Sequence, residues 1–418
     1  MSLPETPALN AVRPQLDPPD DRAGAWGGVV GRSLRLVASV LNVIGSAWIF
    51  GLMCMMLADL GAQVIKVESL EGDQVRARPP LREGFSAYFG NLNAGKQSIA
   101  CNLKSAEMVT LIKQMVASCD VLVENFRPGV MQRFGLDYAT LRDINPRLIY
   151  CSISGYGQTG PKALFPAYAP VIHAASGFDM VNLRYQDGAE RPATSGIFVA
   201  DVLGGTHAFG AIQAALYQRE RTGEGQYIDV SMLEAMVGML VFETQEAQFP
   251  GDARRPLYTP LKTRDGFIMV APTSPRNFEQ LADAVGHPEW REDPRFCTNA
   301  DRNANWATLL ALTEKWTEQH LAEEAEVILS RHGVPCARYR ELGELLDDPQ
   351  LTERGAFAEI GDGAGRYKVS NPPFRMSGSR VEARDHVSCL GQDGTALLAG
   401  LGLDTDRIAA LREKGDLL

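Results

Sequence analysis

Short apolar runs alternate with longer, mixed stretches through the first half of the chain. The apolar runs at residues 34–41, 63–68, 121–124 and 148–152 have the length and composition of buried strands. The stretch at 105–118 is predicted to be a helix, and Gly or Asn-Pro turns join the two kinds of element. Strands that alternate with helices in this way predict an α/β fold with a doubly wound parallel sheet.

The very apolar run at residues 43–57 is predicted to form a buried helix rather than a membrane span. Gly45, Ser46 and Gly51 interrupt the run, and Asp59 follows its end. The run is also shorter than the ~20 apolar residues that a helix needs to cross a bilayer. No membrane partner is therefore expected.

The pattern changes after Asp201. A helix is predicted at residues 204–219 and a strand at 226–230, after a Thr-Gly-Glu-Gly turn. A polar link that contains proline follows near residues 249–255, and the chain beyond it begins with a strand and continues as helices. A compact second domain is therefore expected after the link, followed by strand and turn signals and a charged C-terminal helix.

The chain has 418 residues, which is more than a single hydrophobic core usually supports, so two domains are predicted. The pattern divides the chain into a mobile N-terminal arm, a large α/β domain, a small α+β domain and a C-terminal segment: residues 1–32, 33–245, 246–332 and 333–418. The arm is rich in Pro, Gly, Asp and Arg and has no apolar core, so it is not interpreted as a signal peptide.

Composition narrows the classes of function. Hydrophobic residues make up 45% of the chain and charged residues 22%, which predicts a soluble globular protein. The net charge of -10 argues against nucleic acid as a partner. The seven cysteines are scattered and include no C-x-x-C pair, so no disulfide framework or metal site is expected and a cytoplasmic location fits. Cys101 and Cys151 lie in apolar runs and are interpreted as buried thiols.

Two consecutive strand-and-loop units at residues 120–161 indicate a ligand site. The first strand is followed by Asn-Phe-Arg-Pro-Gly at 125–129, and the second by a Gly-rich loop at 154–161. Open parallel sheets bind ligands at the carboxyl ends of their strands, where backbone N–H groups and the Arg127 guanidinium suit a phosphate. The two loops therefore predict one cleft.

Motifs along most of the chain agree in order and spacing with those of one family. Besides residues 120–161, they are LADLGAQVIKVE (57–68), NAGKQSIACNLK (93–104), RTGEGQYIDVSMLEA (221–235), RPLYTPLKTRDGFIMVAP (255–272), HPEWREDPRF (287–296) and GVPCARYRELGELLDDPQL (333–351). On these motifs the sequence resembles the family III CoA-transferases of the CaiB/BaiF type. That family includes formyl-CoA transferase and carnitine CoA-transferase, and the α-methylacyl-CoA racemases belong to the same superfamily.

The resemblance implies an enzyme that moves coenzyme A from an acyl-CoA to a small free carboxylic acid, without a metal. It also implies that residues 333–418 return to complete the large, CoA-binding domain, and that two subunits form an interlocked homodimer. Two alternatives stay open. One is an acyl-CoA racemase or isomerase, and the other is a non-catalytic CoA-binding protein.

Asp201 is the candidate nucleophile, because the family carries its catalytic aspartate in a motif that stands here as TSGIFVADVLGG at residues 194–205. The resemblance implies that its carboxylate attacks the thioester, forming an anhydride and then an aspartyl-CoA thioester. The apolar residues 197–200 are expected to limit water, and the N–H groups of the following helix to keep the carboxylate ionised. Spacing alone fits an aspartate that caps the helix equally well.

The racemases carry a His that forms an acid/base pair with the same Asp, and Tyr168 occupies the place of that His here. Tyr, with an ordinary pKa near ~10, is a poor proton shuttle but a good hydrogen-bond donor, so Tyr168 favours a transferase. His173 offers another partner for Asp201, although a lone His in an apolar run is more often a core residue.

Two positions depart from the family's pattern. Position 169, which is acidic or amide-bearing in some relatives, is Ala169. The Gly-rich flap of the formyl-CoA transferases is replaced near residues 250–256 by PGDARRP. The two arginines of that segment suggest an acceptor or acyl group that bears a carboxylate, and a solvated surface turn is the alternative.

For coenzyme A, the resemblance carries over Lys104, Asn125, Phe126 and Arg133. Asn125 and Phe126 are expected to contact the nucleotide or pantetheine through the backbone and by stacking. Lys104 and Arg133 are expected to contact the phosphates of coenzyme A, because positive side chains bind phosphate. Each cation taken alone could equally be an ordinary surface residue.

Overall fold

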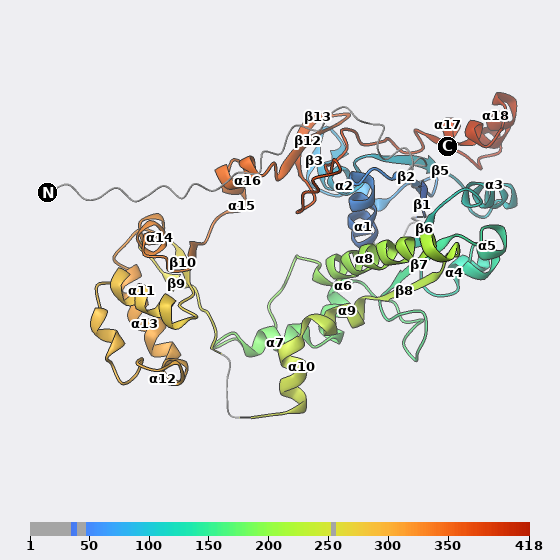
Figure 1. Cartoon of the computed structure of the whole chain (residues 1–418). Coiled ribbons are helices and arrows are strands. Elements are labelled where there is room, and N and C mark those ends of the chain that lie inside the picture. The colour runs from blue at the N-terminus through green and yellow to red at the C-terminus, as the bar shows by residue number, and fades with distance from the viewer. Residues whose placement is uncertain (1–34, 40–46, 252–255) are drawn as a thin grey trace. The chain divides into compact units, whose positions relative to one another are not determined.

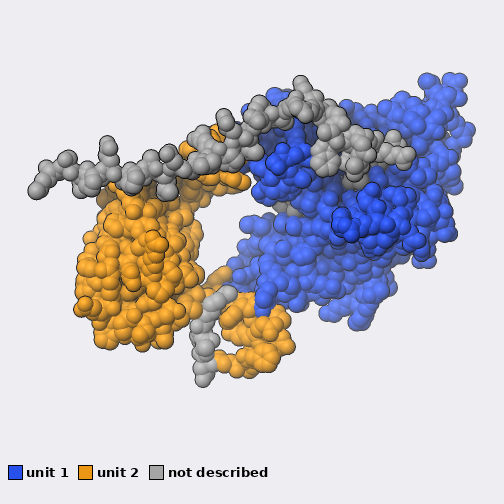
Figure 2. Space-filling model, in the orientation of Figure 1, with its two compact units in different colours: residues 1–183, 190–241, 355–418 blue, residues 184–189, 242–354 orange. Residues whose placement is uncertain are grey.

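The structure is a computed structural model that describes residues 35–39, 47–251 and 256–418 (Figure 1). The predicted arm at 1–32 and residues 252–255 of the flap segment lie outside the described residues. The chain divides into two compact units (Figure 2). Of the described residues, unit 1 comprises those up to 183 together with 190–241 and 355–418, and unit 2 comprises those in 184–189 and 242–354.

Unit 1 is built on a six-stranded sheet in which all neighbouring strands are parallel. The strand order is β5-β2-β1-β6-β7-β8. The bounds are β1 Arg35–Ser39, β2 Gln63–Glu68, β5 Lys96–Ala100, β6 Val121–Glu124, β7 Ile149–Ser154 and β8 Tyr227–Ser231. The predicted α/β fold with a parallel sheet is confirmed.

Helices cover both faces of this sheet, because neighbouring strand residues point to opposite sides and both sides are apolar. Val121 and Val123 pack into one core, and Leu122 packs into the other. The helices beside the first core are α1 Ala47–Asp59, α8 Val199–Thr222 and α9 Met232–Met239. Those beside the second are α3 Ala106–Val116, α5 Tyr138–Ile144, α17 Gly394–Gly400 and α18 Thr405–Glu413.

The remaining elements of unit 1 lie in its connections. They are η1 Gln74–Ala77, β3 Leu81–Arg82, β4 Phe85–Ser86, α2 Ala87–Asn93, α4 Val130–Arg133, α6 Ala169–Ala175, α7 Phe178–Arg184, which ends in unit 2, and the antiparallel pair β12 Phe357–Asp362 and β13 Gly365–Ser370. Of these, α2 packs against α1, and α6 packs against α8 and α9. Both α2 and α6 are therefore linked by packing to the helices that cover the first core.

The strand order contains a switch point between β1 and β6. The chain runs outward from β1 to β2 and β5 and then returns to the other side of β1 with β6. In open parallel sheets the crevice that binds ligands lies outside the carboxyl ends of the strands at such a point. Asn125 directly follows β6, so the fold places the first predicted loop at this crevice.

Unit 2 has its own core around an antiparallel sheet in the order β11-β10-β9. Its elements are α10 Val241–Gln248, which begins at the boundary, β9 Leu261–Lys262, β10 Phe267–Val270, α11 Pro275–Ala284, η2 Pro288–Arg291, α12 Asn299–Ala304, α13 Trp306–Thr317, α14 Ala322–Arg331, β11 Cys336–Arg338, α15 Leu342–Leu345 and α16 Pro349–Glu353. The observed boundary differs from the predicted one at 333. Because β11 pairs with β10, the chain leaves unit 2 only at residue 355.

Two helices test the apolar pattern directly. The predicted buried helix is observed as α1, and Met53, Cys54 and Leu57 are buried in the first core. Within the described residues, no helix has both the length and the apolar character needed to cross a bilayer. The predicted start of the helix after Asp201 is wrong, since α8 begins at Val199 and contains Asp201. Cys101 and Cys151 are buried, as predicted.

Candidate active site

Asp201 is the third residue of α8 and is only 1% exposed. Neither of its carboxyl oxygens accepts a hydrogen bond in the described part of the chain. Burial raises the pKa of Asp201 from 3.8 to about 8. The expected stabilisation of the carboxylate by helix N–H groups is therefore not seen, because these groups do not reach its oxygens. Asp201 is not a capping residue either, since Phe198 occupies the N-cap position.

The first turn of α8 is held by a side chain from another helix. The N–H of Ala200 donates to Nε2 of His173 at 3.1 Å. His173 lies on α6, is 3% exposed and packs beside the ring of Phe178, with ring centroids 5.5 Å apart. While Nε2 accepts this bond it cannot take up a proton from a substrate. The structure therefore does not support an acid/base pair of His173 with Asp201.

Tyr168 is the N-cap residue of α6 and is 36% exposed. Its carbonyl oxygen accepts hydrogen bonds from the N–H groups of Val171 and Ile172. Packing of α6 against α8 brings Tyr168 and Asp201 onto neighbouring helices without a hydrogen bond between their side chains. Ala169 is 1% exposed and packs in the first core. A carboxylate at position 169 would therefore be buried in this core. A small apolar residue such as Ala169 fits this position.

Tyr88, which the sequence did not single out, lies within electrostatic range of Asp201. Burial raises the pKa of its hydroxyl, the nearby charge of Arg78 lowers it, and that of Asp201 raises it further. Tyr88 is in the first turn of α2, whose N-cap Ser86 accepts a hydrogen bond from Phe89 N–H at 3.0 Å. The Ser86 hydroxyl in turn donates to the carbonyl of Arg78 at 2.6 Å. This tether holds Arg78 beside the start of the helix that carries Tyr88.

One of the two predicted CoA-binding cations, Lys104, lines a cavity of 250 Å³. Lys104 lines this cavity together with Phe134, the neighbour of Arg133. The cavity also includes the residues that directly follow β2 and β5, so it opens at the carboxyl edge of the sheet. Lys104 and Arg133 are both exposed, and neither has an ion-pair partner within the described ranges. Both are therefore available to an anionic ligand.

Asn125 and Phe126 are placed differently from each other. Asn125 is 8% exposed at the end of β6. The ring of Phe126 is 4% exposed and belongs to the second core, so it does not offer a surface for stacking. The expected stacking role of Phe126 is thus not supported. Its N–H donates to Glu124 Oε2 at 2.7 Å, which fixes the loop after β6 from within.

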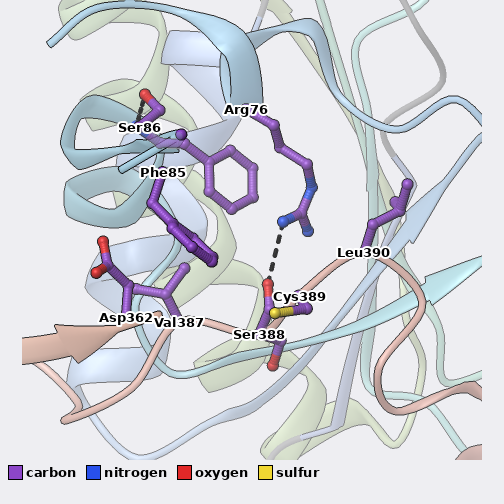
Figure 3. Close-up of a pocket in the computed structure, with 10 residues that line it drawn as sticks. Arg76, Phe85, Ser86, Asp362, Val387, Ser388, Cys389 and Leu390 are labelled. Carbon is purple, nitrogen blue, oxygen red and sulfur yellow. Dashed lines mark hydrogen bonds between the residues drawn. The ribbon is translucent and has the colours of Figure 1, made fainter. Parts of the chain in front are cut away.

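A second cavity of unit 1, of 220 Å³, lies between α2 and the C-terminal segment (Figure 3). The Arg76 guanidinium lies 4.0 Å from the Phe89 ring centroid, contacts Glu68 at 2.7 Å and donates to the Ser388 carbonyl at 3.1 Å. Asp362 forms an ion pair with Arg82 at 3.4 Å. Because the charged residues of this cavity already have partners, it is interpreted as packing that supports α2 rather than as a substrate site.

Comparison with known proteins defines the class of the molecule. The model of CoA-transferase family III matches residues 41–394. The chain therefore belongs to CoA-transferase family III, and its enzyme class is acyl-CoA:carboxylate CoA-transferase. The predicted family is confirmed. In the described part of the chain, no group of three or more His, Cys, Asp or Glu residues is arranged to hold a metal ion.

Individual relatives agree with this assignment. The chain is 37% identical over 354 residues to acetyl-CoA:oxalate CoA-transferase of Acetobacter aceti, covering 82% of this chain and 89% of the relative. It is 36% identical over 328 residues to succinate–glutarate CoA-transferase of Agrobacterium fabrum, covering 73% and 80%. A crystal structure of a CaiB/BaiF family protein from Brucella suis matches with a TM-score of 0.75 and 34% identity, covering 88% and 98%.

Proposed function

We propose that the protein moves coenzyme A from an acyl-CoA to a free carboxylic acid, with Asp201 as the nucleophile. The observation that supports this role is the buried carboxyl of Asp201, whose two oxygens accept no hydrogen bond in the described chain. Burying a carboxyl group without a partner costs free energy of folding, so such groups are rare unless they serve a function. A strongly raised pKa is also typical of reactive groups.

The proposed reaction proceeds through acyl transfer to and from Asp201. Asp201, whose pKa burial raises, first loses its proton to solvent. A carboxylate oxygen of Asp201 then attacks the thioester carbonyl carbon, the C–S bond breaks, and CoA leaves as the thiolate. The thiolate then attacks the Asp201 carbonyl carbon of the anhydride and releases the donor acid, which leaves an aspartyl-CoA thioester. The acceptor carboxylate attacks that thioester to form a second anhydride and frees the thiolate. The thiolate finally attacks the acceptor's carbonyl carbon, which gives the new acyl-CoA and regenerates Asp201.

The hydroxyl groups of Tyr88 and Tyr168 are candidate hydrogen-bond donors to the negative charge that develops in these steps. A raised pKa keeps the hydroxyl of Tyr88 protonated, so it can donate to an oxyanion or to the ionised carboxylate. Tyr168, on the helix that packs against α8, is the second candidate donor. Coenzyme A would lie along the carboxyl edge of the sheet, with Asn125 at the switch point and Lys104 and Arg133 at its phosphates.

An acyl-enzyme provides the direct test of this mechanism. The wild-type protein incubated with acyl-CoA and hydroxylamine should lose activity and gain a hydroxamate on the peptide that contains Asp201, as detected by mass spectrometry. A non-catalytic CoA-binding protein would give neither result. An adduct on another residue, with Asp201 unmodified, would remove Asp201 from the role of nucleophile.

The racemase alternative is separated by isotope exchange. A racemase removes the proton on the α-carbon, so 2-methylacyl-CoA in deuterated water would acquire deuterium. A transferase attacks only the carbonyl carbon, and we expect no enzyme-dependent uptake of deuterium together with transfer of labelled CoA to a free acid. Rapid α-exchange without CoA transfer to any acid would replace the proposal with a racemase.

Loss of either predicted phosphate contact is expected to weaken acyl-CoA binding. Lys104→Ala or Arg133→Ala should each raise KM for acyl-CoA about 3- to 5-fold, as for one exposed charge pair of up to ~1 kcal/mol, with kcat little changed. The effect should shrink as salt is raised, because ions screen exposed charges. The exposed Arg142 on α5 offers a matched control, since Arg142→Ala removes the same charge away from this cavity.

We also propose that the acceptor is a small dicarboxylic acid. The relatives described above are named for oxalate, succinate and glutarate. Arg78 is half-buried, lies within electrostatic range of Tyr88 as Asp201 does, and has no ion-pair partner among the described residues. A guanidinium in that position suits the carboxylate of an acceptor that does not react.

Replacing Arg78 is expected to change the choice of acceptor. Arg78→Met should raise KM for a dicarboxylic acid such as succinate about 10- to 100-fold, the range for a lost charge-assisted contact, and leave KM for acetate nearly unchanged. Arg78→Lys serves as the matched variant, because it keeps the charge without the planar fork. Equal effects on both acids would contradict this assignment.

The interlocked homodimer implied by the family stays part of the proposal. Large apolar side chains of unit 1 are exposed in the single chain, among them Met180 at 59%, Ile197 at 69% and Val241 at 67%. Exposed apolar groups of this kind are typical of surfaces that are covered in an assembly. Light scattering on the purified protein should give twice the mass of 45.5 kDa, and a monomer at that mass would contradict the dimer.

A further inference from the structure

His173 occupies a position that the proposed transferase mechanism leaves without a role. It is a titratable side chain on α6, 3% exposed, and α6 packs against α8. It is nevertheless in direct contact with the backbone next to Asp201, through the 3.1 Å bond from Ala200 N–H to Nε2. A buried polar group that bonds to the residue adjacent to the nucleophile can control where that nucleophile lies.

The hydrogen bond determines the protonation of the imidazole. A backbone N–H can only donate, so Nε2 must present its lone pair. His173 is therefore neutral and carries its proton on Nδ1. Burial lowers the pKa of His173, which agrees with the neutral form, while Asp179 acts in the opposite direction.

The start of α8 explains why this acceptor is needed. The first N–H groups of a helix have no partner within the helix, and a Ser, Thr, Asp or Asn at the N-cap usually accepts from one of them. The N-cap residue of α8 is Phe198, whose side chain contains no acceptor. Val199 N–H donates to the Ile197 carbonyl at 3.1 Å, and Ala200 N–H donates to His173. The His173 imidazole, on α6, thus accepts the hydrogen bond that a side chain at the N-cap of α8 would usually accept.

We propose that His173 is a positioning residue that clamps the Ala200 amide and thereby fixes the backbone from which the Asp201 carboxyl projects. The inference rests on the proposed role of Asp201 as nucleophile. Without the clamp, the first turn of α8 loses its capping acceptor and frays, and the Asp201 carboxyl moves relative to the thioester carbon. A displacement of ~1 Å at a reacting group can lower a rate by about 100-fold. Substrate binding, which does not involve His173, should change little.

Three substitutions separate the clamp from simple packing. Gln places its Oε1 near the position of Nε2, so His173→Gln keeps an acceptor for Ala200 N–H. His173→Leu fills the space without any acceptor, and His173→Asn keeps a polar group that is too short to reach. The matched control is His207→Leu, because His207 is an exposed histidine on α8, the helix that carries Asp201.

We expect His173→Leu to lower kcat about 10- to 100-fold with KM for acyl-CoA changed less than about threefold. His173→Gln should restore most of kcat, and His207→Leu should match the wild type. Formation of the hydroxylamine-trapped adduct should slow in parallel with kcat. If His173→Leu does not fold, His173→Asn is expected to show the same selective loss. Equal losses in folded Gln and Leu variants, or a wild-type kcat in the Leu variant, would overturn the clamp.

Two readouts separate a failure of the clamp from a failure of the proposed function. In the wild-type protein, ¹⁵N NMR of His173 should show an unprotonated Nε2, and hydrogen exchange at the Ala200 amide should be slow and become faster in His173→Leu. A protonated Nε2 would contradict the clamp whatever the activity. A fully active Asp201→Asn variant would show that Asp201 is not the nucleophile, and the clamp would then have no catalytic role. The hydrogen bond from Ala200 N–H to His173 would still be detected.

Discussion

Asp201→Asn is expected to lower kcat for CoA transfer by about 10⁴-fold or more, the scale found when a covalent nucleophile is removed. The amide has nearly the same shape as the carboxyl group but cannot form the anhydride or the aspartyl-CoA thioester. Because Asp201 accepts no hydrogen bond from the described chain, its replacement breaks no hydrogen bond there. The Kd for CoA should stay within about threefold of the wild-type value. Steady-state kinetics and calorimetry with CoA give the two quantities.

The matched control for this prediction is Asp143→Asn, since Asp143 is an exposed aspartate on α5. This variant should keep the wild-type kcat. The trapped adduct should be present in Asp143→Asn and missing in Asp201→Asn. Substantial transfer by Asp201→Asn, after storage at a pH and temperature that exclude deamidation back to Asp, would rule out the covalent mechanism.

The sheet was predictable because its strands are covered on both faces. A strand buried on both sides is a continuous apolar run, and the runs predicted at 63–68 and 121–124 are the observed β2 and β6. The start of α8 was not predictable in this way. The predicted helix began at Gly204, whereas the acceptor for the first turn of the observed helix is His173, on a different helix. No local motif carries that information.

The residues of the candidate site likewise differ in whether a local motif predicts them. Asp201 and the position of Asn125 follow from motifs that lie at an early helical turn and at the end of a strand. Tyr88 lies in α2, far from Asp201 in the sequence, and comes within electrostatic range of it only through folding. Phe126 shows the opposite case, because a motif names the residue but does not determine whether its ring faces the ligand or the core. Side-chain direction depends on packing that residue order alone does not specify.

The environment of Asp201 makes a second prediction, about stability. The pKa of Asp201 is raised to about 8 in the folded protein, against a value of 3.8 without burial. Between these two pH values the folded state keeps the proton and the unfolded state has lost it. The unfolded state then binds fewer protons, so the free energy of unfolding falls as pH rises, by ~1.4 kcal/mol per pH unit at most. Below this window both states are protonated, and above it both are ionised, so this contribution is constant there.

Asn does not titrate, so Asp201→Asn should lack this loss of stability. We expect urea unfolding to show similar stabilities for the variant and the wild type near pH 4, and a variant that is more stable by several kcal/mol at pH 8. Asp143→Asn, which alters an exposed carboxylate, should follow the wild-type curve throughout. A constant difference between Asp201→Asn and the wild type from pH 4 to pH 9 would mean that the Asp201 carboxyl is not held protonated by burial. The proposed mechanism would then need no loss of a proton from Asp201 before its carboxylate attacks the thioester.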